Sequence, residues 1–170
     1  MSVNLDAAFK GGALCLTKAA LAAGTTSTIS NTGTITYAIK GQLYTKSAMT
    51  NAATPTTDVF TGNAFLPLRL SKAAAGVPEA CIIVIGLDAS GNVKAAQGPR
   101  VAAIDITNGV GAYQFPELPD TVAPIGYILV VAGSTQAADW TFGTSNLSSV
   151  TGITFTFRDL MALPAMPITS

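Results

Sequence analysis

The two carboxylates closest together in the sequence are Glu117 and Asp120, in the stretch FPELPD. A pair of carboxylates can hydrolyse a glycosidic bond, one group serving as acid and the other as base or nucleophile. The prolines around both residues favour a solvated loop instead. The chain has no histidine, which excludes catalytic triads built on histidine and removes the commonest general base. We therefore predict that the protein is not an enzyme and has no catalytic residues.

Metal ligands and phosphate-binding loops are equally scarce. Asp88 and Asn92 could bind calcium, but the residues of the stretch DASGN also strongly favour a turn. The turn alone explains why both residues are present. The glycine-rich stretch 108–111 lacks the following helix that phosphate binding uses. Cys15 and Cys81 are far apart and outside any CxxC motif, so we expect two reduced, apolar side chains, with a disulfide as the alternative. The sequence thus predicts no metal and no cofactor.

The charge of the chain argues against a nucleic-acid partner. Nine basic and nine acidic residues give a formal net charge of zero, whereas nucleic-acid binding leaves a basic footprint. Charged residues make up only 11% of the chain, although 49% is hydrophobic. Such a sparsely charged chain suits a protein that is packed against neighbours.

A membrane span is not expected either. The stretch from Ile125 to Ala132 is almost entirely apolar, but Pro124 and Gly133 bound it, and a spanning helix needs about 20 apolar residues. Asp6 and Lys18 make the amino-terminal segment a poor signal peptide.

Short runs of Thr, Val, Ile, Phe and Tyr, separated by Gly, Pro, Asn and Asp, predict an all-β chain. One hairpin is expected over 34–46, with its turn at Lys40-Gly41, and a second over 81–98, with its turn at 88–92. Further strands are expected over 101–106, 125–131 and 150–160. The stretches 49–58, 71–80 and 107–124 are expected to be loops.

The strands differ in how they must be covered. In 152–158 apolar residues alternate with Thr and Arg, which predicts a strand with one solvent-exposed face. In 81–85 and 125–131 both faces are apolar. We place Ile125, Tyr127, Leu129 and Val131 on one face, and Ile128 and Val130 on the other. One face of each sheet builds a core, and the second needs loops or another subunit.

These patterns predict an antiparallel β-sandwich or a small, jelly-roll-like barrel with extended terminal arms. Residues 1–24 form an amino-terminal arm or a short helix that ends at Gly24, residues 25–162 form the β domain, and residues 163–170 form an extended tail.

Four aromatic residues, Trp140, Phe142, Phe155 and Phe157, could form a ligand platform. Phe155 and Phe157 follow strand alternation, so core packing is the better interpretation for them. Trp140 lies in the polar stretch STQAADWTFGTSN, where an interface and a core position are equally well supported.

Several motifs occur in an order that resembles one kind of tailed-bacteriophage virion protein. The first has the form Y-x-I-x-G-x-x-Y and begins at Tyr37, and the second has the form D-x-x-G-N-V and begins at Asp88. A P-x-G-Y strand then begins at Pro124. A segment with Phe142, Gly143, Thr144 and Leu147 follows, before the Thr/Phe strand. The resemblance spans about residues 34 to 167.

This resemblance implies a capsid decoration (cement) protein on the outer surface of the virion head. Proteins of that kind are compact β folds, often homotrimers, and they bind the major capsid protein. The alternative is a head-fibre or tail-associated module that binds a receptor or glycan. The candidate subunit and capsid interface residues are Tyr127, Ile128, Val130, Trp140, Phe142, Leu163, Pro164, Met166 and Pro167.

Overall fold

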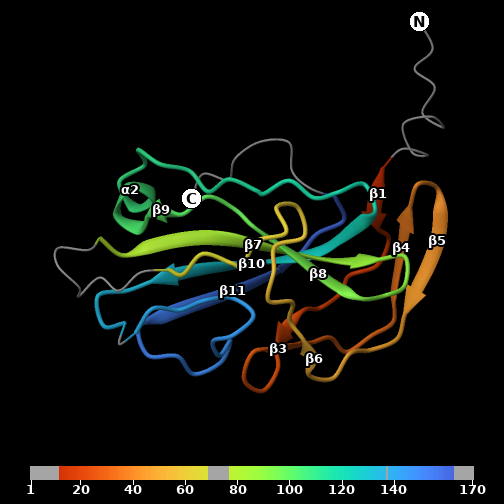
Figure 1. Ribbon diagram of the computed structural model, residues 1–170, viewed down its shortest axis with the longest axis horizontal. Helices are drawn as coiled ribbons and strands as arrows, with labels where there is room; N and C mark the ends of the chain where they lie inside the picture. The colour runs from red at the N-terminus through yellow and green to blue at the C-terminus, as the bar shows by residue number, and fades with distance from the viewer. Residues whose placement is uncertain (1–11, 69–76, 137, 163–170) are drawn as a thin grey trace, which may run out of the picture.

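The structure, a computed structural model, describes residues 12–68, 77–136 and 138–162. Almost all regular structure in these residues is β (Figure 1). The elements are β1 (Ala13–Cys15), β2 (Ala22–Ala23), β3 (Thr28–Ser30), β4 (Ile35–Ile39), β5 (Gln42–Lys46), β6 (Ala52–Ala53), β7 (Glu79–Asp88), β8 (Val93–Gln97), β9 (Val101–Ala102), α2 (Ala103–Thr107), β10 (Val122–Ala132) and β11 (Ile153–Asp159). None of the described helices is long and apolar enough to cross a membrane.

Three antiparallel sheets form a sandwich-like fold. The largest has the order β11-β10-β7-β8, with β9 also paired to β7, and the smaller sheets have the orders β1-β4-β5 and β2-β3-β6. In Figure 1 the small sheets lie below and at one end of the large sheet. The sheets of the described residues do not close into a barrel, so the all-β prediction is confirmed in its sandwich form.

Both predicted hairpins are confirmed. β4 and β5 are joined by Lys40 and Gly41, whose φ angles of 50° and 78° match the left-handed pair that a tight two-residue hairpin turn needs. β7 and β8 are joined by the turn that begins at Asp88. The Tyr37 hydroxyl donates to the Asp88 carbonyl oxygen at 2.8 Å, which ties the first hairpin to the turn of the second.

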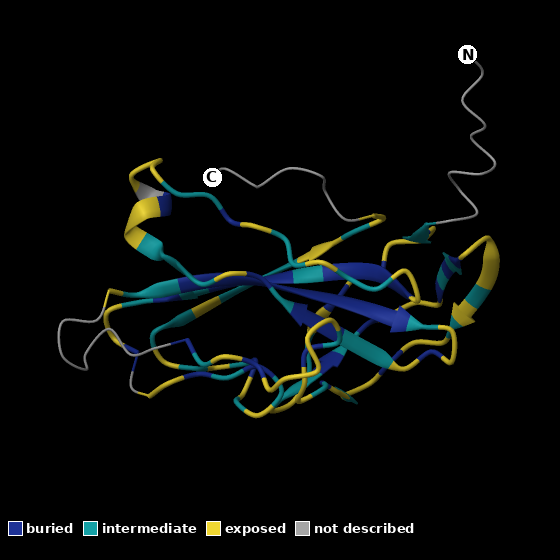
Figure 2. Ribbon diagram, turned by 45° about the horizontal axis from the view of Figure 1, so that its top comes forward, coloured by how far each residue is buried: buried dark blue, intermediate teal, exposed yellow. Residues whose placement is uncertain are grey.

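β7 is buried on both faces, as predicted, whereas β10 is buried on one face and half-buried on the other (Figure 2). Cys81, Ile83 and Ile85 of β7 face the main core with Ile128 and Val130. Tyr127, Leu129 and Val131 face a second, smaller core with Ile82 and Val84.

The predicted position of Ile125 is wrong, because it lies in the main core and not beside Tyr127. A β-bulge shifts the β7–β10 register between Pro124 and Gly126, and the extra residue reverses the alternation there.

The outer face of β7 is covered by the chain's own segment 103–121. Ile106, Tyr113, Phe115 and Leu118 of this segment belong to the second core, over β7. In Figure 1 the segment runs along β7 on the side away from β3 and β6. Loops therefore cover this face without another subunit.

The predicted strand over 101–106 is corrected, because only its first two residues are strand and the rest lies in α2.

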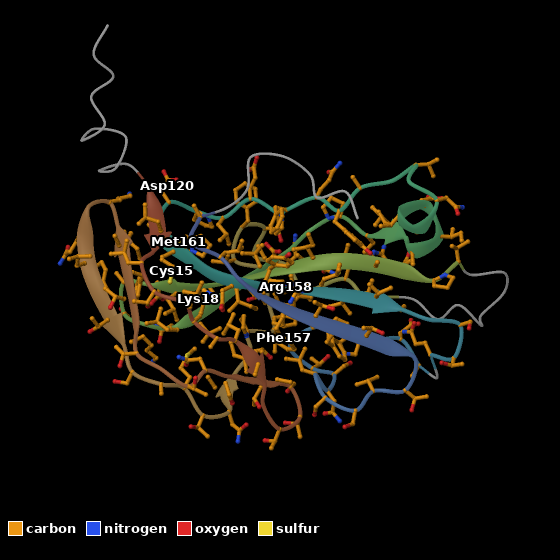
Figure 3. The ribbon with its side chains drawn as sticks, turned by 180° about the vertical axis from the view of Figure 1, so that it is seen from behind. Cys15, Lys18, Asp120, Phe157, Arg158 and Met161 are labelled. Atoms are coloured by element: carbon orange, nitrogen blue, oxygen red, sulfur yellow. The ribbon has the colours of Figure 1, made fainter. Side chains whose placement is uncertain are left out.

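The predicted arm also needs correction. Residues 1–11 of this arm lie outside the described residues. Residues 12–24 contain no helix, and β1 pairs with β4 as an end strand of the sheet β1-β4-β5. Cys15, Ala19 and Leu21 are buried in the main core, so burial overrides the helix propensity of the alanine-rich stretch. The Cys15 N–H donates to the Met161 carbonyl oxygen at 2.8 Å, which brings the first described strand beside the residues after β11 (Figure 3). The tail 163–170 lies outside the described residues.

Candidate protein-contact site

The carboxylate pair singled out in the sequence does not form a cleft. Glu117 and Asp120 are both exposed, in the segment before β10. Glu117 lines a hollow with Phe60 and Phe115, and Asp120 lines a different one with Val122 and Pro124. The two carboxylates thus line separate hollows in an exposed segment, as the prolines around them indicated.

Asp88 organises its turn. Its Oδ1 accepts hydrogen bonds from the N–H groups of Ser90 and Asn92, both at 2.9 Å, and its Oδ2 lies 3.5 Å from Lys94 Nζ. Partial burial acts to raise the pKa of the Asp88 carboxyl, but the hydrogen bonds from Asn92 and Ser90 and the Lys94 charge lower it overall. Within the described residues, no three Cys, Asp or Glu side chains gather as a metal site.

The cysteines are free thiols buried in the main core. Burial raises the pKa of Cys81 to about 12, against the lowering effects of the Gln97 amide and the Arg100 charge. Burial also raises the pKa of Cys15. Buried, protonated thiols are poor nucleophiles, so neither cysteine is equipped for catalysis.

Four of the predicted interface residues are corrected by their burial. Ile128, Val130, Trp140 and Phe142 are at most 2% exposed, so they offer no surface to a partner. Trp140 packs on Phe155 with ring centroids 5.3 Å apart, and its Nε1 donates to the Asn146 carbonyl oxygen at 2.7 Å. It is a core residue, which was the alternative that the sequence left open.

The other interface predictions have different outcomes. Tyr127 is partly exposed and meets Phe115 edge to face, with ring centroids 5.1 Å apart. Leu163, Pro164, Met166 and Pro167 lie outside the described residues.

The motif residues behind the resemblance also build the fold. Tyr37 stacks on Tyr44 across the first hairpin, with ring centroids 5.6 Å apart. Gly126 sits at the bulge, where a Cβ would lie 2.7 Å from the Arg158 carbonyl oxygen. At Gly143, with φ of 83°, a Cβ would collide with the Pro55 carbonyl oxygen. These motifs therefore encode turns and close contacts.

The feature that sequence reasoning missed is the 58–66 loop, which lies along the outer edge of β8. The buried Asp58 carboxylate holds it: Oδ1 accepts from the N–H groups of Phe60 and Thr61, both at 2.9 Å, and Oδ2 accepts from the Gln97 N–H at 2.7 Å. The Val59 N–H donates to the Ala95 carbonyl oxygen at 2.8 Å. The loop thus satisfies part of the β8 edge and is fixed at its first residues.

Gln97 fixes the other end of the same loop. Its Oε1 accepts from the Leu66 N–H at 2.7 Å, and its Nε2 donates to the Leu66 carbonyl oxygen at 2.9 Å. Phe65 points into the core against Phe142, with ring centroids 5.0 Å apart. Because Phe65 is anchored inward, its neighbour Leu66 is held outward.

Two large apolar side chains are therefore exposed on a braced loop, that is, a loop held by hydrogen bonds at both of its ends. Phe60 is 55% exposed and Leu66 is 57% exposed. Beside them lie two hollows of about 370 and 250 Å³, which share Asp58, Thr61, Gln97 and Pro99. We call Phe60, Leu66, Pro99 and Phe115, together with these hollows, the Phe60–Leu66 surface.

The chemistry of this surface suits binding. Its one buried carboxylate, Asp58, accepts hydrogen bonds from three backbone N–H groups and so serves to hold the loop. At its rim Arg100 Nη1 contacts Glu79 Oε2 at 3.2 Å and donates to the Pro67 carbonyl oxygen at 2.8 Å. An apolar centre with a polar rim is the usual anatomy of a protein–protein contact. Phe60 and Leu66 within a Gly- and Asn-containing loop were the available sequence signal.

Comparison of the chain with models of known protein families, with curated proteins and with solved structures finds no match.

Proposed function

We propose that the protein is a capsid decoration protein of a tailed bacteriophage, and that it binds the outer surface of the major capsid shell through the Phe60–Leu66 surface. The observation that carries the proposal is the braced 58–66 loop. It holds Phe60 and Leu66 more than half exposed, although their neighbours Asp58 and Phe65 are buried. Exposed apolar groups on a preorganised loop favour association, because little conformational entropy is lost on binding.

The energetics suit a contact that is repeated by symmetry. Full burial of a Leu or Phe side chain contributes about 1.5–3 kcal/mol, before the cost of association. One such contact is weak, but linked copies on a shell dissociate slowly because their attachments are multivalent. A homotrimer would supply this linkage. In this proposal the chain works without a cofactor and without catalysis.

The assignment to a phage head is supported by the order of the sequence motifs. Their residues build the hairpin turns, the β10 bulge and the close approach at Gly143, so they describe a whole fold and not a transferable site. The low charge of the chain fits a protein that works packed against others.

The test is binding to purified capsids that lack the protein. We expect wild type to bind at a fixed copy number, and Phe60→Ser combined with Leu66→Ser to bind at least tenfold more weakly, since two apolar anchors are lost. The matched control is Val110→Ser, because Val110 is 77% exposed outside this surface. Double-variant binding equal to wild type would show that this surface does not contact the shell. Capsids that neither bind wild type nor gain heat resistance from it would exclude the decoration role.

A second candidate function, a glycan-binding module of a head fibre or tail, is favoured by one hollow of about 500 Å³. Its lining includes Asp139, Thr144, Asn146 and Ser149, which offer carboxylate, hydroxyl and amide groups. Because Trp140 is buried, sugar stacking on its face is not available, and hydrogen bonds would have to hold the ligand. Binding to host polysaccharide that Asn146→Ala abolishes would support this function over the first.

A further inference from the structure

The outer edge of β5 offers a second interaction surface, independent of the capsid proposal. β5 is the last strand of the sheet β1-β4-β5, and Figure 1 shows it at the margin of the molecule. Its pairing with β4 runs over five residues without a bulge. Edge strands of this kind are templates for an added strand unless they are protected.

Hydrogen bonds on the other side of β4 show which groups of β5 point outward. The Thr36 carbonyl oxygen accepts from the Leu16 N–H at 2.8 Å, and the Thr36 N–H donates to Thr17 Oγ1 at 2.9 Å, so Thr36 faces β1. Backbone groups alternate along a strand, so Tyr37 faces β5 and its partner Tyr44 faces back. The N–H and C=O groups of Leu43 and Thr45 therefore point away from the sheet.

The side chains leave this edge accessible. Leu43 is 65% exposed and Thr45 is exposed on the solvent face, whereas Tyr44 packs on Tyr37 on the core side. β5 contains no proline, and its first four residues, 42–45, are uncharged. Among the residues that the structure describes, none bonds to the outward peptide groups of Leu43 and Thr45, so an approaching strand would meet these groups and one apolar side chain.

Charge identifies the class of partner. Lys40 lies at the turn end of the edge, and Lys46 lies at the other end with its side chain along the turn at Gly91. No carboxylate of the described residues forms an ion pair with either lysine. A second copy paired through its own β5 would bring four lysines to one seam without a carboxylate, which is unfavourable. Acidic side chains at the ends of a partner strand would be complementary.

We propose that the outer edge of β5 binds an extended, acidic segment of a partner protein as an additional strand. Backbone hydrogen bonds to Leu43 and Thr45 supply affinity, and ion pairs with Lys40 and Lys46 select acidic segments. The Leu43 side chain adds an apolar contact on the solvent face.

The test uses the synthetic peptide acetyl-Glu-Thr-Val-Thr-Val-Thr-Glu-amide with the full chain, followed by calorimetry and by amide exchange. We expect binding that weakens with added salt, and slower exchange at the Leu43 and Thr45 amides. The same peptide with lysine in place of both glutamates should bind at least tenfold more weakly. Absence of binding by the acidic peptide, or equal binding of the two peptides, would overturn the proposal.

A matched pair of variants locates the contact. Thr45→Pro removes only an outward N–H, a change that edge strands tolerate, and we expect peptide affinity to fall about tenfold. Thr45→Val keeps the N–H and should bind like wild type. The same test can be made on wild-type protein with a peptide that is N-methylated at its central residue, because the methyl group removes a backbone N–H from the peptide. This second test applies even if Thr45→Pro does not fold. Unchanged affinity in either test would place the peptide elsewhere and refute the proposed edge.

Discussion

At the residue scale, Asp58 is the most consequential side chain that we identify. One buried carboxylate receives three backbone N–H groups, two from its own loop and one from Gln97 at the end of β8. It therefore decides both the shape of the 58–66 loop and its attachment to the large sheet. The hydrogen bond from the Phe60 N–H to Asp58 Oδ1 fixes the backbone at the position where Phe60 is exposed.

We expect Asp58→Asn to lower the free energy of unfolding by about 1–3 kcal/mol, because the amide group places a donor where an N–H needs an acceptor. Asp58→Ala should cost more. Urea denaturation followed by circular dichroism measures both changes. Asp120→Asn is the control, since Asp120 is exposed and should stay within about 0.5 kcal/mol of wild type. An Asp58→Asn protein as stable as wild type would show that the hydrogen bonds to the Asp58 carboxylate do not stabilise the fold.

At the element scale, α2 and the segment after it act as a cover for the large sheet. Ile106 of α2 is buried over β7, while Ile104, two residues earlier, is 49% exposed. Substitution of each isoleucine therefore distinguishes the stability that comes from covering β7 from the stability that comes from the helix itself.

Ile106→Ala should destabilise the protein by about 2–4 kcal/mol, because it removes buried methyl groups and leaves a cavity over β7. Ile104→Ala should change stability by less than about 0.5 kcal/mol. Denaturant midpoints measure both changes, and binding of a hydrophobic dye would report any opening of the cover. Equal effects of the two substitutions would show that the segment does not seal the sheet.

Individual elements also show how much of the fold can be predicted from the sequence alone. Both hairpins were predictable because their signals, Lys40-Gly41 and the turn at Asp88, are local. The face of Ile125 was not, because a bulge reverses alternation without a distinctive residue. The contact site was missed for a different reason, since Asp58 acts on Gln97, 39 positions away, and such pairing leaves no periodic signal.

At the scale of the whole molecule, the two thiols report on global unfolding. Cys15 and Cys81 lie in the one core that joins the large sheet to the small sheets. Because burial raises the pKa of Cys81 to about 12, the thiol remains protonated at pH 9 in the folded protein. We expect a thiol reagent to modify Cys81 only at the rate of unfolding, and stoichiometric modification within seconds in native buffer would contradict this core.

The same thiol makes stability depend on alkaline pH. An unfolded cysteine has a pKa of about 8.5, so the raised pKa in the folded state favours folding fully below that pH. This contribution is lost as pH rises from about 8.5 toward 12. Denaturant midpoints from pH 7 to pH 11 should therefore fall more steeply for wild type than for Cys81→Ala. Parallel curves would show that the Cys81 thiol does not titrate with folding.

The bond between the Cys15 N–H and the Met161 carbonyl oxygen has a consequence for synthesis on the ribosome. The β4–β5 hairpin consists of neighbouring residues and can form early, while the chain is still growing. β1 can pair with β4 at that stage, but its contact with Met161 must wait until the last strand has emerged. The sandwich is therefore completed only after β11 is released, and the backbone edge of β10 that pairs with β11 stays unpaired until then.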